Sequence, residues 1–88
     1  MPATERNGRR LLGGAAKRIR EAKKLSQDAV ATGAGINFAY LSKIERNIQQ
    51  PSVEVMCRLA NALGVDLDDI SYMATIYVVP DESEQGAA

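Results

Sequence analysis

The chain has 88 residues, 45% of them hydrophobic and 25% charged, which leaves room for one small folded domain and excludes wholesale disorder or a collagen-like structure. The net charge is zero, yet residues 1–50 carry ten Lys and Arg against four Asp and Glu (+6), whereas residues 51–88 carry one against seven (−6). No apolar stretch approaches the roughly 20 residues of a membrane helix, and the N-terminus lacks a signal-peptide core, so we expect a cytoplasmic protein.

Residues 1–11 are predicted to form a flexible basic arm. They are mostly polar, and Arg6, Arg9 and Arg10 lie among them. Such an arm either reaches the backbone or the minor groove of DNA, as N-terminal arms do in some regulators, or remains a solvated tail.

The folded domain is expected to occupy residues 12–73 and to begin with a helix. This helix is predicted to start near Gly14 or Ala15, because a pair of glycines is a poor helix interior, and to run through Lys24. Its predicted buried face repeats with helical spacing and consists of Leu12, Ala16 and Ile19.

Two short helices follow, each preceded by a capping residue. Ser26 is a good N-cap for the first, which Gly35 soon ends, and Asn37 is a good N-cap for the second, which ends around Glu45 to Asn47. Apolar residues flank each cap at the positions of a hydrophobic staple: Leu25 with Val30, and Ile36 with Leu41.

Ser52 is predicted to cap a fourth helix after a loop that ends at Pro51, and Gly64 suits the position that closes it. The predicted apolar face of this helix consists of Val53, Met56, Leu59, Ala60 and Leu63. Asp66 is predicted to cap a short fifth helix, whose expected core contacts are Leu67 and Ile70.

Residues 74–80 are predicted to form a β-strand, because they are rich in β-branched and aromatic side chains before Pro80. A lone strand leaves its backbone N–H and C=O groups unpaired, and its symmetry mate in a homodimer is the simplest partner. The alternative is an extended segment that packs on the helices. Residues 81–88 are mostly acidic and polar and are expected to be disordered.

The residue types that most enzymes use are scarce. The chain has no histidine and one cysteine, Cys57, which excludes an internal disulfide and argues against a structural zinc site. Without histidine, a Gly-rich phosphate loop or a cluster of metal ligands, we expect no enzyme activity, no cofactor and no metal. Cys57 lies among apolar residues and is expected to be a small buried side chain.

Residues 27–44 have the composition that a helix-turn-helix requires. Two short helices that meet at a steep angle need a small residue at their contact, which is Ala31. The turn between them needs a residue that adopts positive φ without strain, which is Gly35. Apolar residues are expected to hold the joint together: Val30, Ile36, Leu41 and Ile44.

Four segments extend this pattern: 25–27 (Leu-Ser-Gln), 40–47 (Tyr-Leu-Ser-Lys-Ile-Glu-Arg-Asn), 51–52 (Pro-Ser) and 59–65 (Leu-Ala-Asn-Ala-Leu-Gly-Val). Together they closely resemble the Cro/repressor-type helix-turn-helix family, which is also called lambda-repressor-like or Xre-type. The resemblance extends over about residues 12–71. It implies an all-α, five-helix DNA-binding domain whose third helix enters the major groove. We expect the strand at 74–80 as a C-terminal extension, paired across a dimer.

The resemblance implies that the third helix presents five residues to the base edges: Asn37, Phe38, Ala39, Ser42 and Lys43. Lys43 suits guanine, Ser42 suits any base, and Phe38 and Ala39 suit thymine methyl groups. Because Phe38 and Ala39 offer no hydrogen bonds, groove shape is expected to carry part of the recognition. Alternatively, Phe38 packs on the protein or at an interface.

The resemblance also implies phosphate contacts that position the protein without reading sequence. The residues in this set are Gln27, Tyr40, Arg46, Asn47 and Gln49, and the alternative for each is a solvated polar side chain. Arg20 and Glu45 match a salt bridge of the family that ties the first helix to the end of the third. The alternative is two separate charges that face solvent.

These observations predict a sequence-specific DNA-binding transcriptional regulator, by default a repressor, that acts as a homodimer on a pseudo-palindromic operator. The expected partners are double-stranded DNA and a second copy of the chain, with no membrane. The alternative function is an antitoxin or other interaction module. It would bind a partner protein through its acidic C-terminal half, with DNA binding as autoregulation.

Overall fold

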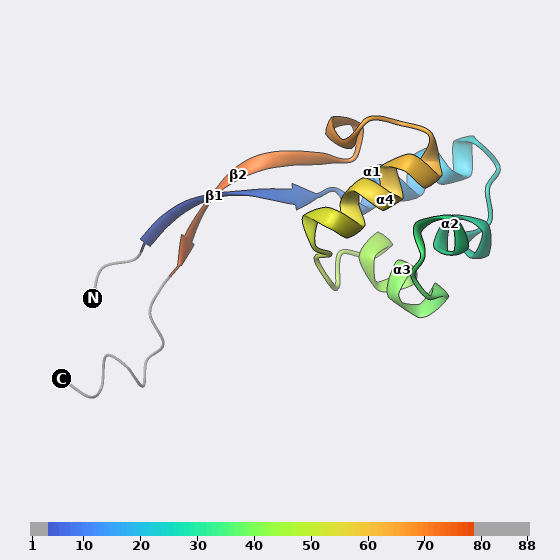
Figure 1. Ribbon diagram of the computed structural model, residues 1–88, viewed down its shortest axis with the longest axis horizontal. Coiled ribbons are helices and arrows are strands. Elements are labelled where there is room, and N and C mark those ends of the chain that lie inside the picture. The colour runs from blue at the N-terminus through green and yellow to red at the C-terminus, as the bar shows by residue number, and fades with distance from the viewer. Residues whose placement is uncertain (1–3, 79–88) are drawn as a thin grey trace.

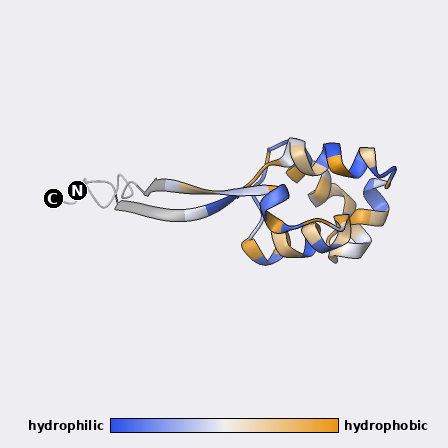
Figure 2. Ribbon diagram, turned by 90° about the horizontal axis from the view of Figure 1, so that it is seen from above, coloured by the Kyte–Doolittle hydropathy of each residue, from blue (hydrophilic) through white to orange (hydrophobic). Residues whose placement is uncertain are grey.

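The computed structural model describes residues 4–78, which form a small helical domain with a two-stranded β-ribbon projecting from it (Figure 1). The helices of the domain are α1 (Gly13–Ala22), α2 (Gln27–Ala34), α3 (Phe38–Glu45), α4 (Val53–Leu63) and the 3-10 helix η1 (Leu67–Asp69). The ribbon consists of β1 (Thr4–Leu11) and β2 (Ser71–Val78), which run antiparallel. The view along a second direction also shows the ribbon extending away from the helices (Figure 2).

Local capping signals place the starts of three helices, as predicted. The side chains of Ser26, Asn37 and Ser52 accept hydrogen bonds from backbone N–H groups three residues further on, at 3.0, 2.7 and 3.2 Å. Gly35 and Gly64 close α2 and α4 with φ of 69° and 72°, a conformation that costs glycine no steric strain. The turn between α2 and α3 therefore has the backbone that the sequence predicted.

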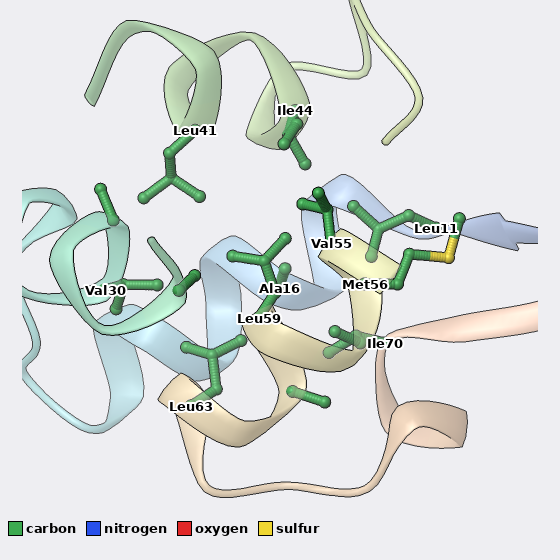
Figure 3. Close-up of a cluster of buried hydrophobic side chains, with 13 residues drawn as sticks. Leu11, Ala16, Val30, Leu41, Ile44, Val55, Met56, Leu59, Leu63 and Ile70 are labelled. Carbon is green, nitrogen blue, oxygen red and sulfur yellow. The ribbon is translucent and has the colours of Figure 1, made fainter. Parts of the chain in front are cut away.

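One apolar core joins all the helices to the inner end of the ribbon (Figure 3). Leu41 and Ile44 point from α3 into this core, opposite Leu59 of α4, and all three are at most 1% exposed. Burial of each such side chain stabilises the fold by about 1.5–3 kcal/mol. The core therefore fixes which face of α3 remains free.

The prediction of a flexible arm was wrong for residues 4–11, which form β1. In the ribbon Leu11 lies opposite Ser71 and Thr4 opposite Val78, so the partner of β1 is more than fifty residues away in sequence. Its own composition, with three arginines and a glycine, carries no strand signal. The structure of this segment is decided by β2.

The predicted C-terminal strand exists, but it begins three residues earlier, at Ser71. Its partner along one edge is β1 of the same chain rather than a symmetry mate. Residues 1–3 and 79–88, which include Pro80 and the predicted disordered tail, lie outside the described part of the chain.

The first helix differs from the prediction in its bounds, whereas the short fifth helix capped by Asp66 is confirmed. The first helix begins at Gly13 and ends at Ala22, and the fifth is a single 3-10 turn with the Asp66 N–H donating to Asp69 Oδ2 at 2.9 Å. Gly13 lies where the start of α1 touches the end of α3. A Cβ at Gly13 would overlap the carbonyl oxygen of Ile44, so this position requires glycine for close approach.

Three apolar residues lie on faces other than those predicted. Leu12 is 45% exposed, because the preceding residue, Leu11, ends β1 and fills the core instead. On α4, Val53 is 50% exposed and Cys57 is also exposed. These two residues are four apart and share a helix face that is rotated away from the buried stripe of Val55, Met56, Leu59, Ala60 and Leu63.

None of the helices in residues 4–78 is both long enough and apolar enough to cross a membrane.

Candidate nucleic-acid interface

Helix α3 has one buried face and one exposed face. Leu41, Ile44 and Glu45 are buried, three and four residues apart, as expected for the inner side of a helix. The opposite side carries most of the residues predicted to face DNA: Phe38, Ala39, Lys43 and Arg46 are exposed, and Ser42 is half-buried. The buried face thus packs α3 against the core, and the exposed face presents a mixed apolar and cationic surface.

An open hollow of about 240 Å³ lies along α3 and the loop that follows it. Its lining consists of Asn37, Ala39, Tyr40, Lys43 and Gln49. Three of these residues belong to the set predicted to contact bases and two to the set predicted to contact phosphates. The fold therefore brings side chains with hydrogen-bond donors from both sets to one concave surface.

The remaining predicted residues on α3 lie outside this hollow. Phe38 is 49% exposed at the start of the helix, so it is not buried within its own domain. Arg46 is exposed at the end of α3, and its Nε donates to the Ser42 carbonyl at 3.3 Å. This bond holds the guanidinium beside the helix and leaves its remaining N–H groups for other acceptors.

Arg20 and Glu45 form the ion pair that the resemblance implied. Arg20 donates from Nε to Glu45 Oε2 at 2.7 Å and from Nη2 to Oε1 at 3.0 Å, and the two side chains are 11% and 1% exposed. The hydrogen bonds to Glu45 raise the pKa of the Arg20 guanidinium, although burial alone would lower it. The alternative of two separate solvent-facing charges was wrong.

The same carboxylate also holds Gln27, at the first turn of α2. Gln27 Nε2 donates to Glu45 Oε1 at 3.0 Å, and Arg20 Nη1 donates to the Leu25 carbonyl at 3.0 Å. One of the two amide N–H donors of Gln27 is therefore used inside the protein, and the prediction of a phosphate contact concerns the other. Glu45 thus joins α1, the start of α2 and the end of α3 in one polar cluster.

Asn47 has a structural role that the sequence did not reveal. Its φ is 60°, a left-handed conformation that asparagine tolerates better than most residues, and its Oδ1 accepts the Gly13 N–H at 3.1 Å. Asn47 is exposed, so its amide nitrogen remains open to the predicted phosphate contact.

Sequence reasoning missed Gln50, which binds the backbone of Leu11. The Leu11 N–H donates to Gln50 Oε1 at 2.9 Å, and Gln50 Nε2 donates to the Leu11 carbonyl at 3.1 Å. A glutamine in a loop carries no local sign of such a partner thirty-nine residues away. Together with Asn47, Gln50 ties the loop after α3 to the junction between β1 and α1.

Three described acidic residues of the C-terminal half lie away from α3. Asp66, Asp68 and Asp69 belong to the η1 turn, which stands on the opposite side of the domain from α3 (Figure 1). Asp68 pairs with Arg9 of β1 at 2.8 Å, so one of the arginines predicted to reach DNA is held by a carboxylate. Among the described residues, these three aspartates are therefore separated from the cationic surface of α3.

No three His, Cys, Asp or Glu side chains within residues 4–78 are grouped so that they could hold a metal ion.

Comparison with known proteins places these features in a family. The helix-turn-helix family HTH_3 matches residues 17–70. An uncharacterized HTH-type transcriptional regulator, y4dJ of Sinorhizobium fredii, is 40% identical over 57 residues, which cover 65% of this chain and 74% of that protein. The immunity repressor protein of Bacillus phage phi105 is 37% identical over 54 residues, which cover 61% of this chain and only 38% of the repressor.

The solved structures include one similar fold with DNA present. The master regulator for biofilm formation SinR, from Bacillus subtilis, in complex with DNA aligns with a TM-score of 0.60 and 34% identity. The alignment covers 65% of this chain and 95% of the SinR chain. The chain described here therefore belongs to the helix-turn-helix family HTH_3.

Proposed function

We propose that the protein is a sequence-specific DNA-binding transcriptional regulator of the cytoplasm that represses by occupying an operator. The observation that carries this proposal is the anchored α3, whose free face lines an open hollow with Asn37, Lys43 and Gln49. A similar domain has been solved in complex with DNA, and a relative is named an immunity repressor. Repression by occlusion needs no further domain.

In this proposal α3 enters the major groove and its exposed face reads base edges. Lys43 donates to guanine O6 and N7, Asn37 and Ser42 offer polar groups, and Phe38 and Ala39 contact thymine methyl groups. A good pairing of this kind discriminates against a wrong base by about 1–3 kcal/mol. Since two of the five side chains form no hydrogen bonds, part of the specificity comes from groove shape.

The phosphate contacts hold α3 in register. Gln27 at the start of α2, together with Tyr40, Arg46, Asn47 and Gln49 around the hollow, would donate to phosphate oxygens on the two sides of the groove. The aspartates of η1 lie on the far side of the domain, so they do not repel this backbone. Two protomers would occupy half-sites about 34 Å apart on a pseudo-palindrome.

A salt-dependent binding titration tests the proposal. The full chain is titrated into a fluorescently labelled mixed-sequence duplex at several salt concentrations, and anisotropy reports binding. We expect the logarithm of the binding constant to fall linearly with the logarithm of the salt concentration, with a slope equivalent to several phosphates. Selection from a random duplex library should then yield a two-fold symmetric site.

Two results would contradict the proposal. Absence of binding even at low salt would show that the exposed face of α3 is not a DNA surface. Binding without any enriched sequence after selection would show a non-specific DNA-binding protein rather than a regulator of particular operators. Co-purification of a second small protein would instead support the antitoxin alternative.

A further inference from the structure

The β1–β2 ribbon extends from the helical domain, and each of its strands has a partner on one side only within the described residues. It leaves the helices and projects away from them (Figures 1 and 2). A two-stranded ribbon is at best marginally stable alone in water and normally gains a further strand or a covering helix. The ribbon therefore has a surface suited to a partner.

The two outer edges of the ribbon differ in chemistry. Strand β1 contains Glu5, Arg6, Arg9 and Arg10 as well as Gly8, whereas β2 (Ser-Tyr-Met-Ala-Thr-Ile-Tyr-Val) contains no charged residue, glycine or proline. Charges and breaks of this kind are the usual protection of a strand edge against pairing with another chain. The edge of β1 is protected, and the edge of β2 is not.

Hydrogen-bonded and non-hydrogen-bonded residue pairs alternate along an antiparallel ribbon, and this alternation shows which backbone groups face outward. The Leu12 N–H donates to the Ile70 carbonyl at 2.7 Å, so the adjacent Leu11–Ser71 pair is a non-hydrogen-bonded pair of the antiparallel ladder. Alternate pairs share this character, including Arg9 with Met73. The N–H and C=O of Met73 therefore point away from β1, and its side chain is 58% exposed.

The position and length of the ribbon suit a second copy of the chain, provided that the proposed function holds. Gln50 fastens the inner end of β1 to the loop that follows α3. Half-sites about 34 Å apart would put the two-fold axis about 17 Å from each recognition helix. Eight residues of strand span about 27 Å, so each ribbon is long enough to cross that axis.

We infer that the outer edge of β2 pairs antiparallel with β2 of a second copy, forming a four-stranded sheet in which the two β1 strands are the outer ones. Antiparallel pairing of identical edges is self-complementary, so one two-fold axis generates the whole interface. The uncharged edges become internal and the charged β1 edges remain in water. This inference rests on the proposed function for its spacing and names the surface through which that regulator dimerises.

Three variants of the full chain test the edge assignment. Met73→Pro removes an outward N–H of β2 and leaves the hydrogen bonds between β1 and β2 in place. Met73→Ser removes the same apolar side chain but keeps the N–H. Asn7→Pro places a proline on the outer edge of β1, two residues before Arg9, where the backbone N–H has the same outward direction as that of Arg9.

Sedimentation equilibrium gives the dimer dissociation constant of each variant, and circular dichroism checks that the helices remain folded. We expect Met73→Pro to raise the dissociation constant by about tenfold or more, as loss of one or two backbone hydrogen bonds implies. Met73→Ser and Asn7→Pro should remain dimers. A dimer unaffected by Met73→Pro, a dimer broken only by Asn7→Pro, or a wild-type monomer would overturn the inference.

Anisotropy with duplexes that carry one or two half-sites separates this inference from the proposed function. Met73→Pro should bind a single half-site like the wild type and lose the extra affinity for two. A wild-type monomer that still binds a half-site would leave the DNA-binding function standing and refute only the β2 interface. Loss of all DNA binding in the wild type would refute the proposed function itself.

Discussion

Gln50 takes the place of a neighbouring strand for Leu11: its amide accepts the Leu11 N–H at 2.9 Å and donates to the Leu11 carbonyl at 3.1 Å. These two bonds close the end of β1 and join the ribbon to the loop that follows α3. Leu11 is only 3% exposed, so its backbone has little access to water as a substitute partner.

Gln50→Ala should therefore destabilise the fold by about 1–3 kcal/mol, the range for leaving a buried polar group without a partner. Urea unfolding followed by circular dichroism measures the change. Gln49→Ala is the matched control, because Gln49 is exposed and should change stability by less than about 0.5 kcal/mol while weakening DNA binding. Equal stability of the two variants would contradict a structural role for Gln50.

Removal of Glu45 should have a larger effect on stability. Glu45→Ala leaves the Arg20 guanidinium buried without its partner and also frees the Gln27 amide. The expected loss in the free energy of unfolding is about 3–5 kcal/mol, as for other broken buried pairs. Thermal or urea unfolding at neutral pH measures it.

Glu21→Ala is the control for this pair, because Glu21 lies 4.0 Å from Arg20 but is 56% exposed, so we expect a loss below about 1 kcal/mol. The pH dependence gives a second check. The hydrogen bonds to Glu45 raise the pKa of Arg20 in the folded state, so its contribution to stability is full below the ordinary pKa of arginine and is lost only as the pH rises through the raised folded-state pKa. The penalty of Glu45→Ala should be the same at about pH 7 and pH 10, and a penalty that fades by pH 10 would contradict this assignment.

Substitution by alanine should change the free energy of unfolding differently at two adjacent glycines. A Cβ at Gly13 would overlap the Ile44 carbonyl oxygen, so Gly13→Ala should destabilise the fold by about 1–3 kcal/mol or more. A Cβ at Gly14 meets nothing within 4 Å, so Gly14→Ala should be neutral or stabilise α1 by up to about 1 kcal/mol. Chemical unfolding of both variants measures the difference, and a stable Gly13→Ala protein would show that α1 and α3 separate readily.

Arg46→Ala should weaken binding to all DNA sequences alike. Its exposed guanidinium at the end of α3 is proposed to contact a phosphate, so its loss should reduce the salt slope by about one unit. Arg18→Ala removes a charge on α1 that is also exposed and serves as the control. If both variants lower the slope equally, the effect of Arg46 is general charge rather than a specific contact.

Lys43→Ala should instead change sequence preference. Lys43 lines the hollow on α3 and is proposed to read guanine, so its loss should relax discrimination at one base position by about 1–3 kcal/mol. Binding to a library of single-base operator variants measures this preference position by position. An unchanged profile with uniformly lower affinity would move Lys43 from the base contacts to the phosphate contacts.

Local signals in the sequence determined the helical part of the fold. Capping at Ser26, Asn37 and Ser52 and the turn glycines at 35 and 64 depend only on residues a few positions away, so they are legible without the tertiary structure. The exposed face of α3 follows from the same helical spacing. The Arg20–Glu45 pair was found through resemblance, whereas the DNA contacts of Lys43 and its neighbours remain predictions.

Only the tertiary structure decided the features that depend on distant partners. Strand β1 forms because β2 lies beside it, and Leu11 rather than Leu12 is buried because the strand directs it into the core. Gly13, Asn47 and Gln50 have their roles because α1 and the loop after α3 meet at one place. No local composition predicts such meetings, since their free energy comes from contacts between segments more than thirty residues apart.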